Sequence, residues 1–544
     1  MGHRLDRIIY IITIIYIALP IYMFLATWLN MPAAIPACIL FLISFLFFFR
    51  NKPKEIEWHL TRKHLTTVLA SVLILAIWLY FSGLGGFSFQ NSDYQYRNAI
   101  LHDLINKSWP VIYDYSAQAG QSILGSSNQA MLTYYIAYWL PAAAVGKMFG
   151  WLAANFFLYM WSLTGVMLIV YYLFRTLRNA RVWSVLIMIF FSGADIIGYL
   201  IVTHGKLPGL IQHIEWWSGL QYSSNTTLLY WVFNQTIVMW LAILLIMNLP
   251  NSRSLFFLYA MLLLHGPFPF LGLLPFVLWK AYEGYPLVDN RTAEKHSNPL
   301  SIFAKWFFAG VKRAVTFENI FGGISVLLIS YFYLSNNVSG GKTGTNSFDA
   351  SMFLFIVFDA GLFLIILALD HAKSPLYWLC VISLLVIPFF QIGVGQDFCM
   401  RVSIPALFVI QILVQKSLFG KPDIQEKTPE DGKPLRSRKY IRIVLAGLLV
   451  IGMTVPLQEI TRSVTYSLLA YPLTHKLMVN IGSGLADSNL PVLAPYGKNL
   501  EAQGWVGFLQ SDSIGTLGNN FNTSGNFIGP IHDNLFYIYL ARHQ

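Results

Sequence analysis

Charged residues are scarce in this chain. Only 11% of its 544 residues are Asp, Glu, Lys or Arg, whereas 56% are hydrophobic. A soluble globular chain carries roughly a quarter charged residues, so this composition, with a mean hydropathy of +0.56, excludes an ordinary water-soluble domain. Cysteine is rare too: Cys38, Cys380 and Cys399 all lie in or beside apolar runs, without the spacing of metal ligands. We interpret these three residues as packing residues.

The motifs of common soluble enzymes are also missing. The sequence has no glycine-rich phosphate loop, no zinc-ligand spacing and no Ser-His-Asp arrangement. A net charge of +11 would favour nucleic-acid binding in a soluble protein, but here the positions of the charges matter more than their sum. We therefore predict no nucleic-acid partner, no cofactor and no metal site; nothing in the sequence supports a divalent metal ion.

Apolar runs of about 20 residues, the length of a helix that crosses a bilayer, recur along most of the chain. They predict an all-α polytopic membrane protein with about 13 transmembrane helices. The first run continues to about Leu29 without a small-residue cleavage site, so we interpret it as a retained helix. The predicted crossings are residues 8–29, 32–49, 66–84, 152–174, 182–203, 227–249, a broken pair over 254–280, 318–335, 351–369, 374–394, 403–419 and 442–457.

Basic residues are distributed unevenly between the two sides of the membrane in this predicted topology. With the N-terminus inside, the inner segments hold 26 of the 36 Lys and Arg residues. This asymmetry is the one expected when basic loops orient a membrane protein. We therefore expect a multi-pass protein of the cell membrane, with a cytoplasmic N-terminus and an extracytoplasmic C-terminus.

The threading divides the chain into two parts. Residues 1–457 form the transmembrane module, with a large outer loop at 85–151, and residues 458–544 form a small extracytoplasmic C-terminal region. Within the outer loop, the run 131–150 is long enough to cross, but Pro141 and its aromatic, polar start favour a helix lying in the outer interface. The pair over 254–280 is interrupted by "HGPFPF", so we expect it to be buried within the bundle.

The outer loop begins with the most polar stretch in its neighbourhood. Its segment "SDYQYRNAILHDLI" has the pattern of an amphipathic helix with a cap at Ser92 or Asp93. Asp93, Arg97 and Asp103 would then lie above a cavity at the membrane surface. The plainer interpretation is that an aspartate in this position only caps a helix or is solvated.

At these residues the sequence resembles the GT-C superfamily of integral membrane glycosyltransferases, which use polyprenyl-phosphate-linked sugars. In that superfamily the first large outer loop carries an acidic motif, followed by interfacial helices and a crossing that ends in basic residues. Here the same order is found in "NSDYQYRNAILHDLINKSWPVIYDY", then "YYIAYWLPAAAVGKMFG", then "MWSLTGVMLIVYYLFRTLRNAR". Family members often have adjacent acids, whereas Tyr94 follows Asp93 here, which weakens the expectation of a metal site. More than one crossing precedes the loop, where one is usual, and this departure indicates a separate bacterial subfamily.

The resemblance implies a membrane glycosyltransferase that moves a sugar from a polyprenyl-phosphate donor to an envelope glycan or lipid-linked acceptor. It makes Asp93 the general base that takes the proton of the acceptor hydroxyl. The departing phosphate needs positive charge, and we expect Arg401 first and Arg97 second to supply it. A plain salt bridge between Arg401 and Asp397, one helical turn earlier, is the structural alternative.

Other polar and aromatic residues of the outer side are candidates for binding the sugar or the acceptor. Aromatic faces beside amide and acidic groups suit a sugar, although Trp and Tyr also form ordinary interfacial belts. Asp195 and Asp359 fall inside predicted helices, where ionisable groups are functional candidates, while His265 is better explained as a histidine packed within the bundle. The predicted sugar or acceptor residues are Tyr94, Asp103, His213, Glu215, Trp216, Gln221 and Asp397.

Two other functions stay open. An envelope polysaccharide polymerase or ligase also has many helices and a large outer loop, and it would depend on arginine and histidine rather than on Asp93. A transporter or flippase of lipid-linked sugars would need a polar pathway across the whole bilayer, whereas the candidate residues gather on one side. The short inner loops leave no room for a soluble nucleotide-sugar domain, so a glycosyltransferase of this shape needs a lipid-linked donor.

Overall fold

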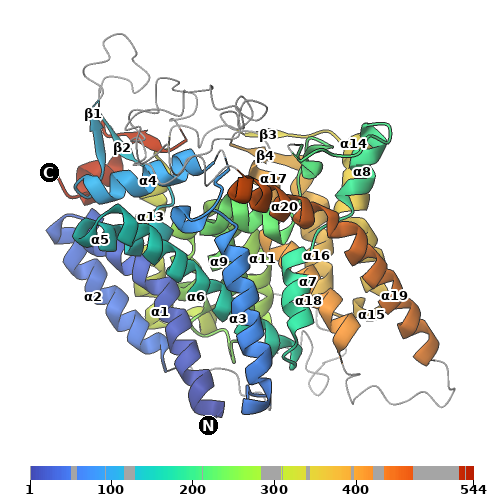
Figure 1. Cartoon of the computed structure of the whole chain (residues 1–544). Helices are drawn as coiled ribbons and strands as arrows, with labels where there is room; N and C mark the ends of the chain where they lie inside the picture. The colour runs from blue at the N-terminus through green and yellow to red at the C-terminus, as the bar shows by residue number, and fades with distance from the viewer. Residues whose placement is uncertain are drawn as a thin grey trace, which may run out of the picture.

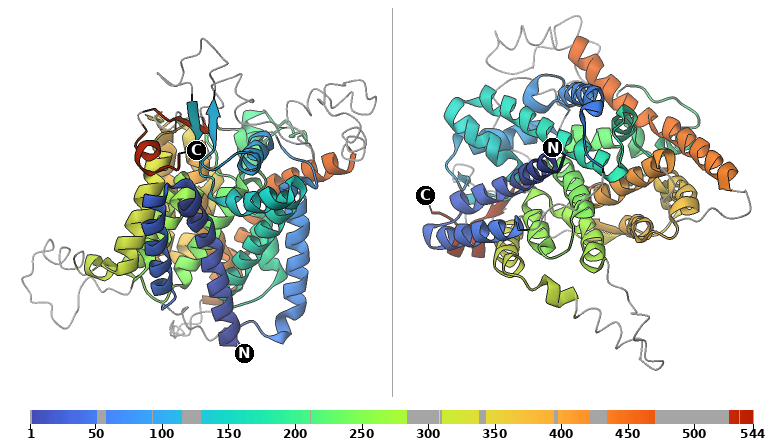
Figure 2. Two further views of the ribbon diagram at one scale, coloured as in Figure 1. Left: turned by 90° about the vertical axis from the view of Figure 1, so that its left-hand side faces the viewer. Right: turned by 90° about the horizontal axis from the view of Figure 1, so that it is seen from below.

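The computed structural model describes most of the chain, and the structural statements below concern that part. Most of its long helices run along a common direction and form a bundle, with the two termini at opposite ends (Figures 1 and 2). We call the end that carries the N-terminus the basal end and the opposite end the distal end. The described residues are 2–50, 58–91, 93–114, 129–210, 212–283, 308, 310–337, 343–393, 397–420, 434–469, 526–532 and 534–543.

Eight helical stretches within the described ranges are long and apolar enough to cross a membrane. This agrees with the prediction of an all-α membrane protein. Two of the stretches are broken in the middle, and a third contains a wide π-helical turn. The eight are α1 (Gly2–Trp28), α2 (Met31–Phe48), α3 (Leu65–Tyr80), α6 (Trp151–Leu177), α7 (Val182–Phe190) with α8 (Asp195–Val202), α9 (Asn225–Asn248), α14 (Ala350–Ile356) with η7 (Val357–Gly361) and α15 (Leu362–His371), and α19 (Pro434–Gly452) with α20 (Thr454–Leu469).

Shorter apolar helices fill the rest of the bundle. Every run predicted as a crossing contains a helix, but these shorter ones do not reach the length of a full crossing by themselves. His265, at the break within 254–280, is buried and its Nε2 lies 3.1 Å from the carbonyl oxygen of Ile17, as expected for a packed histidine. These elements are α10 (Leu255–Met261), η5 (Leu263–His265), α11 (Pro267–Tyr282), η6 (Glu318–Ile324), α13 (Ser325–Leu334), α16 (Pro375–Val386), η8 (Ile387–Phe389) and α18 (Ile404–Phe419).

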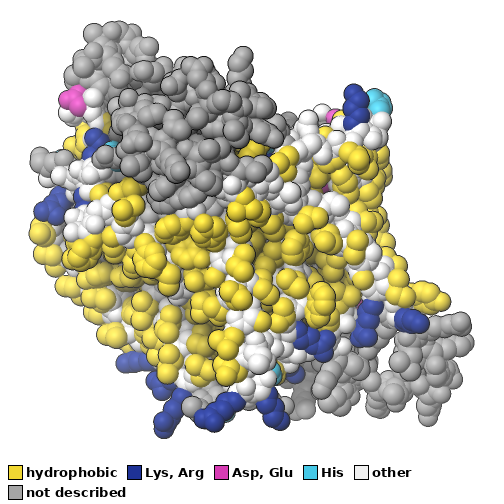
Figure 3. Space-filling view, viewed as in Figure 1, with side chains coloured by type: hydrophobic (Ala, Val, Ile, Leu, Met, Phe, Trp, Pro, Cys, Tyr) yellow, Lys and Arg dark blue, Asp and Glu magenta, His cyan; other side chains and the backbone are white. Residues whose placement is uncertain are grey.

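The bundle is arranged around α9. In the most apolar part of this helix 94% of the residues are buried, and α6, α11 and α18 pack against it. Exposed leucines such as Leu69, Leu152 and Leu369 face outward from the peripheral helices. Figure 3 shows the result as a broad hydrophobic belt, with Lys and Arg gathered mainly at the basal end. An apolar exterior around a well-packed interior is what a bilayer requires.

Short elements cover the distal end. The run 131–150 is split into a strand, a turn of 3₁₀-helix and a ten-residue helix, too short to cross a bilayer. Gly150, with φ of +84°, then turns the chain into α6. Two small antiparallel sheets, which the sequence did not predict, also lie here. The distal elements are η2 (Leu84–Gly86), α4 (Tyr94–Asn106), β1 (Ile112–Asp114), β2 (Gln129–Leu132), η3 (Ala137–Trp139), α5 (Leu140–Phe149), η4 (Ile214–Trp216), β3 (Thr343–Thr345), β4 (Phe390–Ile392) and α17 (Asp397–Val402).

The C-terminal part of the chain is tied to this end. Helix α20 continues past the predicted boundary at 457/458 and lies across the distal end of α9 and α7 (Figure 1). Strand β5 (Ile528–Pro530) pairs with β2, so the sheet order is β1-β2-β5. The π-helical turn η10 (Phe536–Leu540) follows, and Ala541 pairs with Leu29 at the end of α1. Residues 470–525, most of the predicted C-terminal region, lie outside the described residues.

Candidate functional site

Two aspartate–arginine pairs stand at the distal end. Asp93 Oδ2 lies 2.8 Å from Arg97 Nη2, and Asp397 Oδ2 lies 2.9 Å from Arg401 Nη2, each pair one helical turn apart. The carboxylates keep 38% and 42% of their side-chain surface exposed, whereas the arginines keep only 7% and 12%. The arrangement therefore presents two carboxylates outward, above two nearly buried guanidinium groups.

The two pairs belong to one electrostatic cluster. Burial lowers the pKa of Arg401, but the carboxylates of Asp397 and Asp93, together with nearby phenols, outweigh this effect and keep the pKa above its ordinary value. Arg401 Nη1 donates a hydrogen bond of 2.7 Å to the hydroxyl of Tyr135, which also accepts one from Tyr134. Burial raises the pKa of both phenols, so they stay protonated.

The start of α4 places Asp93 and Arg97. The Asp93 backbone N–H donates to Asn91 Oδ1, and Asn91 Nδ2 donates to the carbonyl of Tyr230 at 3.0 Å. That carbonyl belongs to the stretch of α9 just before Val232, whose φ of −135° and ψ of 38° interrupt the helix. Beyond the interruption, Asn234 Oδ1 accepts a hydrogen bond of 2.9 Å from Arg97 Nη1. Residues on the two sides of the kink in α9 thus bind Asn91, which precedes Asp93, and Arg97, which follows it.

Three nitrogen donors in this cluster have no acceptor among the described residues. The Nε atoms of Arg97 and Arg401 and the Nδ2 of Asn234 are buried and have no hydrogen-bond partner within the part of the chain that the structure describes. Buried donors are almost always satisfied in folded proteins. A ligand or water with acceptor oxygens would complete this set. Nowhere in the described ranges are three or more His, Cys, Asp or Glu residues arranged to hold a metal ion.

Two of the predicted sugar-site residues on α4 have internal partners instead. Tyr94 is buried, and its hydroxyl donates to the carbonyl of Ser82, two residues beyond α3, at 2.9 Å. Asp103 is completely buried and accepts a hydrogen bond of 2.7 Å from the hydroxyl of Tyr113 in β1. These contacts attach α4 to its neighbours, so holding the fold together accounts for both residues.

Glu215 and Gln221 support the N-terminus of α9, whose N-cap is Ser224. Glu215 Oε1 accepts from the backbone N–H of Ser224 at 2.7 Å and from the hydroxyl of Thr227 at 2.8 Å, and Gln221 Nε2 donates to Oε2 at 2.8 Å. Burial, reinforced by the nearby carboxylate of Asp195, raises the pKa of Glu215 to about 8. A buried carboxyl group at the N-terminus of the central helix is a structural arrangement.

His213 and Trp216 belong to a third group, together with α20. Their rings stack with centroids 4.0 Å apart, and 57% of Trp216 is exposed. His213 Nδ1 lies 3.4 Å from Glu459 Oε1, and that carboxylate accepts a hydrogen bond of 2.8 Å from Arg462. Arg462 Nη2 also donates to the carbonyl of Gln212, so α20 is fastened to this loop.

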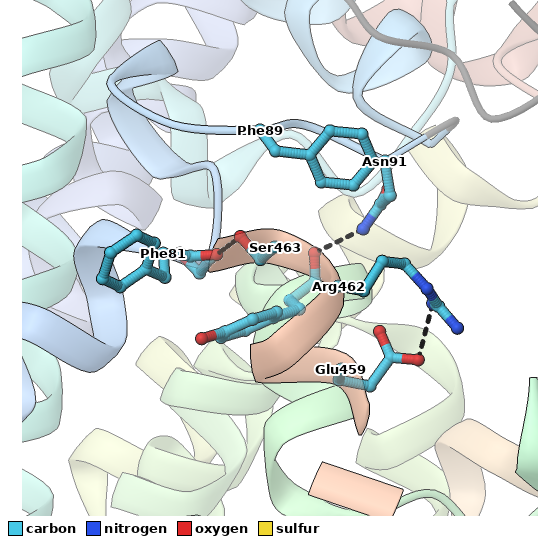
Figure 4. A pocket seen from close by; sticks show the side chains of 8 residues that line it. Phe81, Phe89, Asn91, Glu459, Arg462 and Ser463 are labelled. Atoms are coloured by element: carbon cyan, nitrogen blue, oxygen red, sulfur yellow. Dashed lines mark hydrogen bonds and ion pairs between the residues drawn. The ribbon is translucent and has the colours of Figure 1, made fainter. Parts of the chain in front are cut away.

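A small cavity lies between this ion pair and the outer loop. Its volume is about 10 Å³, room for roughly one water molecule. Figure 4 shows Asn91 and Phe89 on one side and Glu459 with Arg462 on the other. Asn91 lines this cavity and also accepts a hydrogen bond from the backbone N–H of Asp93, so the cavity borders the start of α4 as well as α20.

Two more carboxylates meet deep in the bundle, where helices are interrupted. The break between α7 and α8 packs on the π-helical turn η7, and the Ala194 N–H donates to the carbonyl of Phe358 at 2.8 Å. Asp195 begins α8 and Asp359 lies in η7, and both are fully or almost fully buried. Both oxygens of Asp359 and Oδ1 of Asp195 have no geometrically formed hydrogen bond with any described residue.

The structure therefore places four of the predicted site residues in one cluster and gives most of the others internal partners. The pair Asp93–Arg97 and the pair Asp397–Arg401 lie within electrostatic reach of each other, although about 300 residues separate them in the sequence. Tyr135 and Asn234, which bind the arginines, were not among the predicted site residues. Asn234 lies in "QYSSNTTLLYWVFNQ", where a polar residue within an apolar run was the available signal. No protein-family profile, no curated protein and no solved structure matches this chain.

Proposed function

We propose that this protein is a membrane glycosyltransferase that moves a sugar from a polyprenyl-phosphate-linked donor to an envelope glycan or a lipid-linked acceptor. The observation that carries the proposal is the cluster of Asp93, Arg97, Asp397 and Arg401, in which partly exposed carboxylates adjoin nearly buried guanidinium groups. The motif order that resembles the GT-C superfamily supplies the reaction type.

The proposed reaction divides the work between the carboxylates and the arginines. Asp93 takes the proton of the acceptor hydroxyl as its oxygen forms a bond to the anomeric carbon of the sugar. The bond between that carbon and the phosphate oxygen breaks, and the polyprenyl phosphate leaves with an additional negative charge. Arg401 and Arg97 stabilise this charge, because both guanidinium groups have donor atoms to offer.

The site requires a particular orientation in the membrane. We infer about 13 crossings, a cytoplasmic N-terminus and a distal end that faces the extracytoplasmic side. The basic residues at the basal end support this orientation (Figure 3). Donor and acceptor would then both reach the cluster from the outer leaflet, with no nucleotide at the site.

The experiment compares Asp93→Asn with the wild-type protein in purified form. Transfer of a radiolabelled sugar from a polyprenyl-phosphate donor should fall by about a hundredfold or more, since a general base contributes roughly 10² to 10⁴ in rate. The matched control is Asp370→Asn, which removes an exposed aspartate at the end of α15. It should retain full activity.

Because Asp93 is paired with the nearly buried Arg97, the melting temperature of each variant has to be measured as well. Asp93→Glu keeps the charge and should retain part of the activity at a similar melting temperature. Near-normal turnover by Asp93→Asn would refute the assignment of the base. Loss of activity only in Arg401 and His213 variants would instead indicate a polymerase or ligase.

A transporter of lipid-linked sugars is the second candidate, favoured by one observation. Asp195 and Asp359 are buried carboxylates at interrupted helices, a combination found at the binding sites of many secondary transporters. In reconstituted vesicles, a transporter would move a labelled donor across the bilayer without covalent change. A glycosyltransferase would transfer the label to an acceptor in detergent solution.

A further inference from the structure

A second cavity lies at the distal end, beside the C-terminal end of α4 and away from Asp93, which stands at the other end of that helix. Its volume is about 530 Å³, within the range of small-molecule sites. The surrounding segments are the end of α1, the connection from α4 to β1, helix α5 and the last described residues. Its lining residues are Thr27, Ser108, Trp109, Lys147, Arg542 and His543.

The cavity lies where two membrane-length helices end. Thr27 is the penultimate residue of the stretch His3–Trp28, and Lys147 precedes the stretch Trp151–Leu177 by four residues. In a bilayer, the ends of such helices lie at the level of the lipid headgroups. The cavity is therefore at the depth where a charged headgroup is found.

The described lining of this cavity carries charge of one sign. Lys147 and Arg542 line it together with His543, and no Asp or Glu is among the described lining residues. Lys147 Nζ lies 5.2 Å from the centre of the Trp109 ring and donates to the carbonyls of Lys107 and Ile105, at 2.6 and 3.2 Å. These bonds hold the ammonium group in place and leave it one N–H to donate.

Arg542 is placed by its backbone. Its N–H donates to the carbonyl of Trp28 at 2.9 Å, while its side chain is exposed and makes no hydrogen bond or ion pair with any described residue. A guanidinium group held in this way can bind a phosphate through two parallel hydrogen bonds. The site thus combines a fixed ammonium group with an available guanidinium group.

The surface next to the cavity is strongly apolar. Met148, Phe149 and Leu152, at the corner between α5 and α6, are 73%, 70% and 68% exposed. Large exposed apolar side chains beside basic ones are typical of surfaces that contact the interface of a membrane. They provide a place for acyl chains directly beside the basic residues.

We propose that this cavity binds the phosphate-bearing headgroup of an anionic membrane lipid. Lys147 and Arg542 bind the phosphate, and the apolar corner contacts the acyl chains. The proposal does not depend on the proposed glycosyl transfer, because the cavity shares no lining residue with the cluster of Asp93 and Arg401. A bound lipid would instead hold together the end of α1, α5 and the C-terminal segment.

The test measures binding of a fluorescent phosphatidylglycerol to the purified full-length protein in detergent. A basic residue near an anionic lipid surface contributes about 1 kcal/mol, or roughly fivefold in affinity. Arg542→Gln should therefore weaken binding about fivefold, and Arg542→Gln with Lys147→Gln at least about tenfold. Arg542→Lys should retain most of the affinity.

Two controls separate this site from general effects. Lys206→Gln removes an exposed basic residue elsewhere, beyond α8, and should bind like the wild type. Because Lys147 also supports α4, Arg542→Gln is the decisive variant if the double variant loses thermal stability. Unchanged affinity of Arg542→Gln would overturn the proposal. So would equal binding of phosphatidylcholine, or full competition by millimolar inorganic phosphate, which would indicate a site for free phosphate.

Discussion

Asp93 and Asp397 each stand four residues before an arginine, and the same spacing serves both structure and chemistry. The structural alternative for Arg401, a salt bridge to Asp397, is formed. It does not use all the donors of the guanidinium group, because the Nε atoms of both arginines have no partner in the described part of the chain. The carboxylates stay partly exposed while the arginines are nearly buried, so each carboxylate can reach a ligand as well as its arginine partner.

Glu215 provides a pH-dependent prediction at the residue scale. Its pKa is raised from 4.5 to about 8, mainly by burial. Between these values the folded protein holds a proton that the unfolded chain has released. The free energy of unfolding therefore falls as the pH rises from about 4.5 to about 8. The Glu215→Gln variant cannot ionise here, so its stability should depend less on pH.

Melting temperatures in detergent between pH 5 and 8.5 check this prediction. The control is Asp370→Asn, which removes an exposed carboxylate at the end of α15; its stability should follow the wild-type curve. If Glu215→Gln loses stability with rising pH as steeply as the wild type, the buried carboxyl group is not the cause.

At the scale of elements, the position of Arg401 depends on close packing between α11 and α17. A Cβ added at Gly272 in α11 would lie 1.9 Å from the carbonyl oxygen of Val402. A backbone carbonyl cannot move away as a flexible side chain can, so any larger residue must push α17 outward. Gly272 thus allows the short helix with Asp397 and Arg401 to approach the bundle.

We predict that Gly272→Ala destabilises the protein by roughly 1 to 3 kcal/mol, the usual cost of overpacking, and lowers any activity that depends on Arg401. The melting temperature and the transfer assay measure the two effects. Gly447→Ala is the matched control, because nothing lies within 4 Å of a Cβ at that position in α19. Equal melting temperatures for the two alanine variants would contradict the packing argument.

At the scale of the whole molecule, the hydrophobic belt and the basic basal end predict a single orientation in the membrane. Lys206 is exposed beyond α8 at the distal end, and Lys373 is exposed between α15 and α16 at the basal end. In intact cells, a membrane-impermeant maleimide should label Lys206→Cys at once. It should label Lys373→Cys only after the membrane is permeabilised.

The background for this labelling is favourable. All three native cysteines are free; Cys380 and Cys399 are buried, and only the half-buried Cys38 needs replacement by alanine. The reverse pattern, with Lys373→Cys labelled in intact cells, would place the candidate site in the cytoplasm. It would also exclude an extracytoplasmic glycosyl transfer.

The sequence alone determined the class of this protein and the positions of its helices. Apolar runs act locally, since a bilayer selects helices by length and polarity whatever their neighbours are. The amphipathic pattern likewise located the helix that begins after Asp93. The small sheets were not predictable, because β2 pairs with β5 from almost 400 residues away.

Only the tertiary structure decided which polar residues share a site. Asp103 and Glu215 resembled Asp93 in the sequence, but packing surrounds them with internal donors, whereas Asp93 and Asp397 stay partly exposed. The hydrogen bond between Arg97 and Asn234 depends on the kink in α9. The hydrogen bond between Arg401 and Tyr135 depends on the packing of α17. Burial and partners arise from contacts distant in the chain, and no local pattern of residues encodes them.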